Sequence, residues 1–124
     1  MIRKSARLLP AVALSLVALP AAAERLRCDF DRVCAPDGCR STSYELRIEW
    51  DGEDGRFTDG AGRSGDVTVA EMEAFWHFIE IMDRGDLVMT SVADGGVAVH
   101  SKHALLGGEL KPTQYYGACR RGEG

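Results

Sequence analysis

The chain has 124 residues, of which 45% are hydrophobic, and its 15 Lys and Arg against 19 Asp and Glu give a formal net charge of −4 at pH 7. This length and composition predict one globular domain. The acidic balance argues against nucleic acid and anionic lipid as main partners, because both need a basic surface. It is compatible with a basic protein partner, although a contribution of the charge to solubility alone would explain it.

The first 23 residues predict a secretory signal peptide. They begin with the positive charges of Arg3, Lys4 and Arg7. An apolar run follows over residues 8–19, and residues 20–23 form a cleavage site of small residues. Cleavage after Ala23 removes three basic and no acidic residues, so 101 residues with 12 Lys and Arg against 19 Asp and Glu remain, a net charge of −7. We therefore expect a signal peptide over residues 1–23, a single β domain over residues 24–124, and a periplasmic or secreted protein.

The apolar run of the leader is too short for a membrane span, which needs about 20 residues. No second apolar run follows it, and Glu24, not cysteine, follows the expected cleavage site. We therefore expect neither a membrane span nor a lipid anchor.

Alternating apolar and charged residues predict the first strands of the mature chain. Leu26, Cys28 and Phe30 alternate with charged residues and predict a first strand, which a turn at residues 36–38 follows. Residues 44–51 hold the cleanest alternation and predict a half-buried antiparallel strand whose apolar face is Tyr44, Leu46, Ile48 and Trp50. A short strand at residues 56–58 would interrupt the polar, glycine-rich segment that follows.

The segment from Thr68 to Met82 is ambiguous. Thr68 and Glu71 match a capping box at the start of a helix. The aromatic and β-branched residues from position 75 onward favour a strand instead. We therefore expect a helical turn or loop over residues 68–74 and a strand over residues 75–82.

The remainder of the chain predicts three more strands. They cover residues 87–93, 97–103 and 114–120, with a turn at 94–96 and a glycine- and proline-marked connection at 106–112. About seven strands joined mostly by short turns predict a mainly β fold with at most one short helical turn. We expect an antiparallel meander that closes into a small barrel or sandwich and is stapled by disulfides.

Four cysteines allow three disulfide connectivities. Cys28 and Cys119 lie at inward positions of the first and last predicted strands, and Cys34 and Cys39 bracket a turn. We therefore predict the pairs Cys28–Cys119 and Cys34–Cys39. The sequence has no C-x-x-C and no Cys/His cluster with zinc-ligand spacing, so we expect neither a metal site nor thiol catalysis.

The strand over residues 97–103 carries the strongest candidate for a binding surface. His100 and Lys102 share one of its faces, and we expect this face to be in solvent while Val97 and Val99 face inward. The candidate binding residues are His100, Lys102 and, from the next strand, Gln114 and Tyr116. They would suit a polar ligand or a protein surface, although an ordinary solvated sheet face would look the same.

Motifs of enzymes and cofactor sites are missing. There is no Gly-x-Ser-x-Gly, no glycine-rich phosphate loop, and no calcium-loop spacing among Asp51, Glu53, Asp54 and Asp59, so we assign no catalytic residue and no cofactor. A hydrolytic enzyme would need a carboxylate and at least two of His77, His100 and His103 in one cleft. We expect a non-enzymatic exported protein that binds a periplasmic or envelope protein or a small ligand; the alternatives are such an enzyme or a purely structural envelope protein.

Two motifs of the C-terminal half form an expected final strand pair: His100-Ser101-Lys102-His103 and Gln114-Tyr115-Tyr116-Gly117-x-Cys119. Over roughly residues 75–120 the chain resembles a group of small exported bacterial proteins with no assigned activity. This resemblance implies a cysteine-stapled β fold and no particular function. As a class, the chain is also similar to the periplasmic inhibitors of c-type lysozyme, which are small, acidic, disulfide-containing β-barrels. Their Ser-Gly…Tyr and Trp-Lys-Gly-type motifs are not found here.

Overall fold

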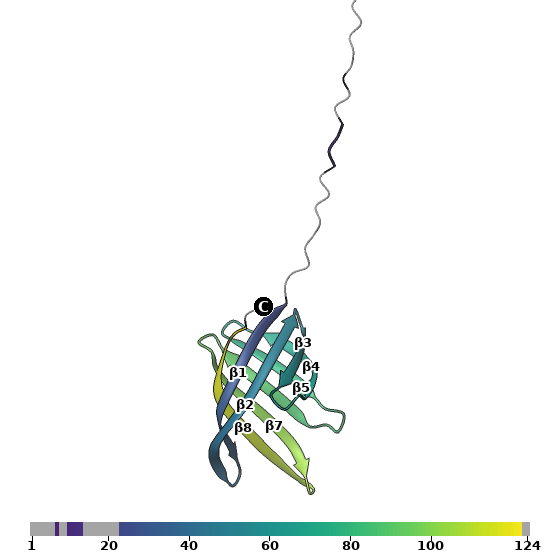
Figure 1. The fold of residues 1–124 in the computed structure, drawn as a ribbon. Helices are drawn as coiled ribbons and strands as arrows, with labels where there is room; N and C mark the ends of the chain where they lie inside the picture. Colours follow the sequence, from purple (N-terminus) through teal and green to yellow (C-terminus); the bar gives the residue numbers. More distant parts are fainter. Residues whose placement is uncertain (1–6, 8–9, 14–22, 123–124) are drawn as a thin grey trace, which may run out of the picture.

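The computed structural model describes residue 7, residues 10–13 and residues 23–122. Within these residues the chain forms eight antiparallel strands and no helix (Figure 1). The strands are β1 (Glu24–Ala35), β2 (Gly38–Asp51), β3 (Asp54–Asp59), β4 (Ser64–Glu71), β5 (Phe75–Ile81), β6 (Leu87–Ala93), β7 (Val97–Leu106) and β8 (Glu109–Arg121). Most of the expected signal peptide lies outside the described residues, and its cleavage stays a prediction.

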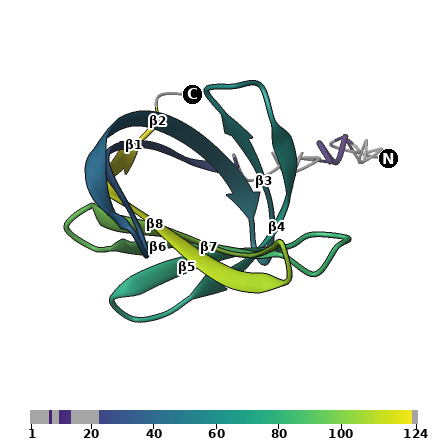
Figure 2. The same ribbon diagram turned by 90° about the horizontal axis from the view of Figure 1, so that it is seen from below.

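Each strand pairs with the next one along the chain, and β8 returns to pair with β1, so the sheet is a closed barrel (Figures 1 and 2). This confirms the mainly β meander that the sequence predicts. The start of β1 and the end of β8 lie at the same end of the barrel (Figure 1). We call the opposite end the mouth end; the connections after β1, β3, β5 and β7 lie there.

The period-two pattern of the sequence becomes the two faces of the barrel wall. Leu26, Cys28 and Phe30 on β1 are at most 5% exposed, and Leu46, Ile48 and Trp50 on β2 are buried with them, while Tyr44 is partly buried against this core. The core is completed by Phe57, Val67, Val69, Phe78, Val92, Ala98 and Cys119. An eight-stranded barrel of this kind is just wide enough for side chains to fill its interior.

Both predicted disulfides are confirmed. Cys28–Cys119 joins β1 to β8, where the two residues lie directly opposite each other, so this bridge fastens the seam that closes the barrel. Cys34–Cys39 joins the ends of β1 and β2 across their turn. No cysteine in the described part of the chain is free.

The prediction of a helical turn or loop over residues 68–74 is wrong for residues 68–71, whereas residues 72–74 form the connection between β4 and β5. The segment belongs to β4 up to Glu71, because Val67 and Val69 alternate inward with Thr68 facing out. The burial of two β-branched residues at a spacing of two outweighs the capping-box pattern. The predicted strand from residue 75 is confirmed as β5.

The predicted connection over residues 106–112 is also wrong. It is a tight hairpin whose turn is Gly107-Gly108, both with positive φ (60° and 80°), so β7 and β8 continue up to this turn. The described residues form eight strands where seven were expected, and the additional strand is β4. Pro112 lies inside β8. It is tolerated because β8 pairs with β1 only from Gln114 onward, so the missing N–H of Pro112 faces no second partner strand.

Candidate functional site

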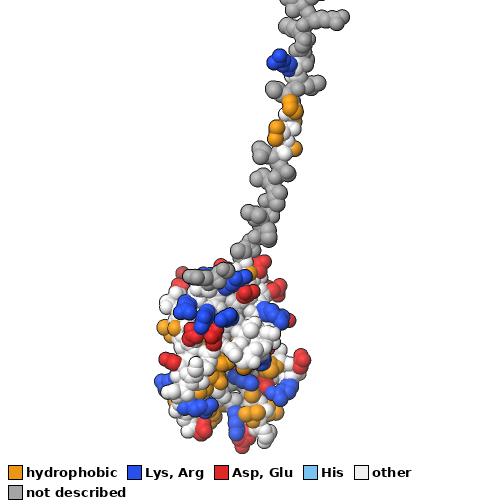
Figure 3. Space-filling view, in the orientation of Figure 1, with side chains coloured by type: hydrophobic (Ala, Val, Ile, Leu, Met, Phe, Trp, Pro, Cys, Tyr) orange, Lys and Arg blue, Asp and Glu red, His pale blue; other side chains and the backbone are white. Residues whose placement is uncertain are grey.

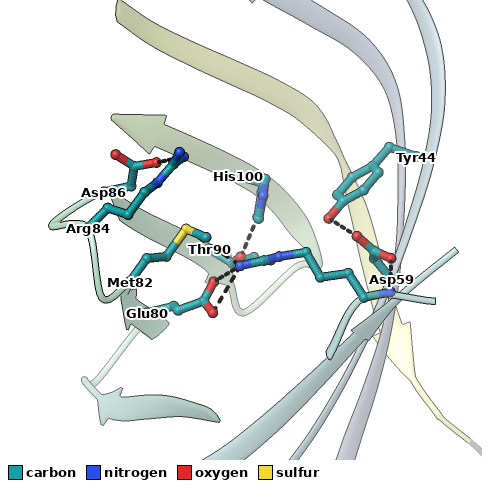
Figure 4. Close-up of polar contacts among 9 residues, drawn as sticks. Tyr44, Asp59, Glu80, Met82, Arg84, Asp86, Thr90 and His100 are labelled. Atoms are coloured by element: carbon teal, nitrogen blue, oxygen red, sulfur yellow. Dashed lines mark hydrogen bonds and ion pairs between the residues drawn. The ribbon is translucent and has the colours of Figure 1, made fainter. Parts of the chain in front are cut away.

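The inner face of the barrel turns from apolar to polar toward the mouth end. Asp59 follows Phe57 on β3, and Glu80 follows Phe78 on β5, each two residues further along the same face. We define the polar mouth as six residues on or beside this end of the interior: Tyr44, Asp59, Arg63, Glu80, Thr90 and His100 (Figure 4). Five different strands and one connection therefore contribute to a single cluster.

Arg63 covers the polar mouth from the connection between β3 and β4. Its Nη2 donates hydrogen bonds to both carboxylate oxygens of Glu80, at 2.8 and 3.1 Å, and its guanidinium lies 4.8 Å from the ring centroid of Phe57. The side chain of Glu80 is only 13% exposed, so the ion pair is partly shielded from water. The pair ties β5 to the connection that follows β3 and closes this part of the barrel.

Asp59 shapes the connection that carries Arg63. One of its oxygens, Oδ1, accepts hydrogen bonds from the backbone N–H groups of Ala61 and Arg63, at 3.0 and 2.9 Å. Its other oxygen, Oδ2, accepts a 3.3 Å bond from the hydroxyl of Tyr44. Burial and the neighbouring Asp59 charge raise the pKa of Tyr44, so the phenol stays protonated and remains a donor.

His100 and Thr90 form the buried part of the polar mouth. Their Nδ1 and Oγ1 atoms lie 2.7 Å apart, and the residues are 7% and 3% exposed. Burial, followed by the positive charges of Arg63 and Lys102, lowers the pKa of His100 to about 4, and Asp59 opposes this only in part. The imidazole is therefore neutral at pH 7.

A small cavity lies beneath Arg63. It is lined by Arg63, Glu80, Thr90, His100 and apolar core side chains, and its volume is about 10 Å³. That volume holds about one water molecule. The barrel is therefore packed and does not enclose a space for a larger ligand while Arg63 stays on Glu80.

The structure separates the four residues that the sequence singles out for binding. His100 and Lys102 share the inner face of β7, whereas Gln114 and Tyr116 lie on the outer face of β8. There the Tyr116 hydroxyl donates a 2.7 Å hydrogen bond to Gln114, and the guanidinium of Arg32 lies 5.5 Å from the Tyr116 ring centroid. Whether any of the four binds a partner stays a prediction.

The predicted orientation of β7 is wrong. Val97 is 68% exposed and His100 only 7%, so the histidine face, and not the valine face, is inside. The inner face of β7 also carries Ala98 and Ala104, which are 1% and 6% exposed. The small side chain of Ala98 suits this inner face, because it lies opposite Gly117, whose backbone closely approaches Asp29 and Phe30 on β1. His100 instead packs among aromatic rings, with centroids 5.7 Å from Phe30 and 5.4 Å from Tyr44.

A second feature of the mouth end was also missed. The hairpin of β7 and β8 exposes three leucines at its end: Leu105 (63%), Leu106 (54%) and Leu110 (71%). We call these three residues the leucine tip. Leu105 and Leu110 lie directly opposite each other across the hairpin. The signal was present in the Leu-Leu-Gly-Gly-Glu-Leu sequence, but its glycines suggested an irregular connection.

The geometry does not assemble the histidines that an enzyme would need. His77 and His103 lie on the outer face of the wall, and Nδ1 of His77 is 2.8 Å from the hydroxyl of Ser91. Of the three histidines only His100 faces the interior. Within the described residues there is also no group of three or more His, Cys, Asp or Glu that could hold a metal ion.

Comparisons with family models, curated proteins and solved structures found no match to this chain. In the part of the chain that is described, no helix is long and apolar enough to cross a membrane. Function must therefore be argued from the geometry of the polar mouth and the leucine tip.

Proposed function

We propose that this protein is an exported, non-enzymatic β-barrel that binds another exported or envelope protein at its mouth end. The observation that carries the proposal is the leucine tip. Residues 104–113 pair only within the β7–β8 hairpin, because the contacts of β7 with β6 and of β8 with β1 stop before them. The tip therefore projects beyond the barrel wall, at the end opposite to the start of β1 and the end of β8 (Figure 1).

The energetics of the leucine tip favour a role in association. Full burial of one leucine side chain contributes about 1.5–3 kcal/mol relative to leaving it in water. Contiguous apolar side chains on a projecting element are unusual for a surface without a partner. The strand pairs Leu105–Leu110 and Leu106–Glu109 hold the tip in a hairpin, which reduces the conformational entropy that it loses on binding.

The charge around the leucine tip indicates the chemistry of the partner. Lys102 and Lys111, the two lysines in the described part of the chain, both lie on this hairpin, beside the single carboxylate Glu109. We therefore propose a partner surface with an apolar groove and an acidic rim. This differs from the basic partner that the total charge of the chain suggests, because the hairpin is locally basic.

The packed interior favours a protein partner over a small ligand. The cavity beneath Arg63 has room for about one water, so a small molecule would find no preformed pocket there. An exported location is supported by the leader-like first 23 residues and by two disulfides, which persist in oxidising compartments. The outward positions of His77 and His103 give no support to the hydrolytic alternative.

The test compares two apolar surfaces of the same barrel. A Leu105→Ser, Leu110→Ser double variant removes most of the leucine tip, and Val97→Ser removes a side chain on the same strand at the other end, 68% exposed. Proteins captured from periplasm and envelope extract by residues 24–124 are identified by mass spectrometry, and the captured protein is purified and titrated. We expect the double variant to lose at least about tenfold in affinity and Val97→Ser to bind normally. Unchanged affinity of a folded double variant would refute the proposal.

A further inference from the structure

Three arginines lie side by side on the outer face of the barrel. Arg27 on β1 is directly opposite Arg47 on β2 and, on its other side, directly opposite Arg120 on β8. We call these three residues the arginine row. They lie on three neighbouring strands, near the end of the barrel where β1 starts and β8 ends, and the leucine tip lies at the opposite end. Figure 3 shows basic side chains gathered on this face, with carboxylates between them.

The arginine row is costly to the fold. Like charges directly opposite each other on neighbouring strands destabilise a sheet. A row of three guanidinium groups in a chain with an excess of acidic residues is therefore not explained by folding alone.

The carboxylates on this face neutralise the row only in part. Glu45 contacts two of the three arginines, Arg27 at 3.2 Å and Arg47 at 3.0 Å. Asp29 lies 3.8 Å from Nε of Arg27, and this buried Nε has no hydrogen-bond partner in the described residues. Arg120 has no ion pair within the described part of the chain. The row therefore retains donors and positive charge for a further anion.

The surface around the arginine row is hollowed. A groove of about 640 Å³ is lined by all three of its arginines together with Arg25 and Arg121. Arg25 is held by Glu49 at 3.1 Å, and Arg121 lies 3.7 Å from Glu24, so these two form a more neutral border. The groove is open to solvent and has room for a small molecule.

We propose that the arginine row is a binding site for phosphate groups. The planar guanidinium matches the tetrahedral oxyanion with two parallel N–H···O bonds. Residues directly opposite each other on antiparallel strands are about 4.5–5.5 Å apart at Cα, so three of them span about 10 Å. That span suits two linked phosphates. The phosphate comes either from a small soluble molecule or from the headgroup of a lipid, and the site is independent of the leucine tip.

The binding test uses residues 24–124 and inorganic pyrophosphate at constant ionic strength, measured by calorimetry. Arg47→Gln and Arg120→Gln should each weaken binding by about tenfold. Arg56→Gln is the matched control, because Arg56 is an exposed arginine on the outer face of β3 that pairs with Asp66. Glu45→Gln should tighten binding, since it removes the carboxylate that competes for Arg27 and Arg47. Absence of binding to both this probe and the vesicles below, or equal loss in the control, would overturn the proposal.

Two further arms separate a ligand site from a structural role and identify the source of the phosphate. Without pyrophosphate, Arg120→Gln should leave the melting temperature unchanged or raise it, because it relieves repulsion; a clear decrease would assign a structural role and contradict the site. Vesicles of phosphatidylcholine with and without phosphatidic acid test the lipid source. If the protein binds the phosphatidic acid vesicles and the arginine-row variants do not, the phosphate belongs to a lipid headgroup. If the protein binds pyrophosphate but not these vesicles, the phosphate belongs to a soluble compound.

Discussion

His100 shows how burial and neighbouring charges set the chemistry of the polar mouth. The residue is 7% exposed, and the positive charges of Arg63 and Lys102 face it together with the negative charge of Asp59. Burial makes the largest contribution to its lowered pKa, so the neutral imidazole belongs to the folded state. A proton on His100 therefore opposes folding.

This predicts a specific loss of stability in acid. The unfolded chain takes up the His100 proton below pH 6.5, whereas the folded chain takes it up only near pH 4. Between these values the unfolded state binds more protons, so stability falls as pH falls from 6.5 to 4, by at most about 3 kcal/mol. Urea unfolding against pH should show a shallower slope in this window for His100→Gln than for the natural chain. Parallel curves would show that His100 does not titrate as described.

Gly117 is a second position where one residue controls the packing. A Cβ at this position would collide with the backbone of Asp29 and Phe30 on β1. We expect Gly117→Ala to destabilise the barrel by more than about 2 kcal/mol, because backbone cannot move aside as a side chain can. Gly60→Ala is the control, since its Cβ would meet Glu45 at an ordinary 3.6 Å. Similar unfolding midpoints for the two variants in urea would contradict this packing.

At the scale of the elements, the two disulfides fasten different parts of the barrel. Cys28–Cys119 spans 91 residues and fastens β1 to β8, whereas Cys34–Cys39 spans five residues within one hairpin. In the chain-entropy model the long loop is worth about 4–5 kcal/mol and the short loop about 2 kcal/mol. The double variant Cys28→Ala, Cys119→Ala should therefore be less stable in urea than Cys34→Ala, Cys39→Ala. The reverse order would mean that the seam is held mainly by hydrogen bonds and packing.

Strong alternation predicts both a strand and its buried face, whereas for β7 the sequence predicts the strand but not the face that is buried. Residues 44–51 combine apolar and charged residues so regularly that only one face can be buried. In β7 both faces are apolar enough to be inside, so valines at 97 and 99 suggested the wrong face. The pairing of Ala98 with Gly117, where β8 closely approaches the backbone of β1, is seen only once the strands are paired.

The candidate site was harder to predict than the fold. The alternation of side chains along a strand correctly places His100 and Lys102 on one face. The polar mouth also needs Asp59, Arg63 and Glu80, which come from two other strands and a connection that are distant in sequence. The sequence around each of these three charged residues does not distinguish it from a charged residue on the surface. Their meeting depends on barrel closure and on the register of five strands, which a single sequence does not display.

At the scale of the whole molecule, the barrel has two ends with different surfaces. The end where β1 starts and β8 ends carries the arginine row, and the mouth end carries the polar mouth and the leucine tip. Two disulfides and a filled core make the wall between them rigid. The central claim is that this rigid wall presents the leucine tip to a protein partner.

Site-specific photocrosslinking of the protein in intact cells tests this proposal. A photoreactive residue is placed at Leu110 in one variant and at Val97 in another, two apolar positions of similar exposure (71% and 68%) at opposite ends of the barrel. We predict one discrete crosslinked protein from position 110, absent from position 97 and lost when Leu105→Ser is added. The same crosslinked protein from both positions, or none from position 110, would contradict the account.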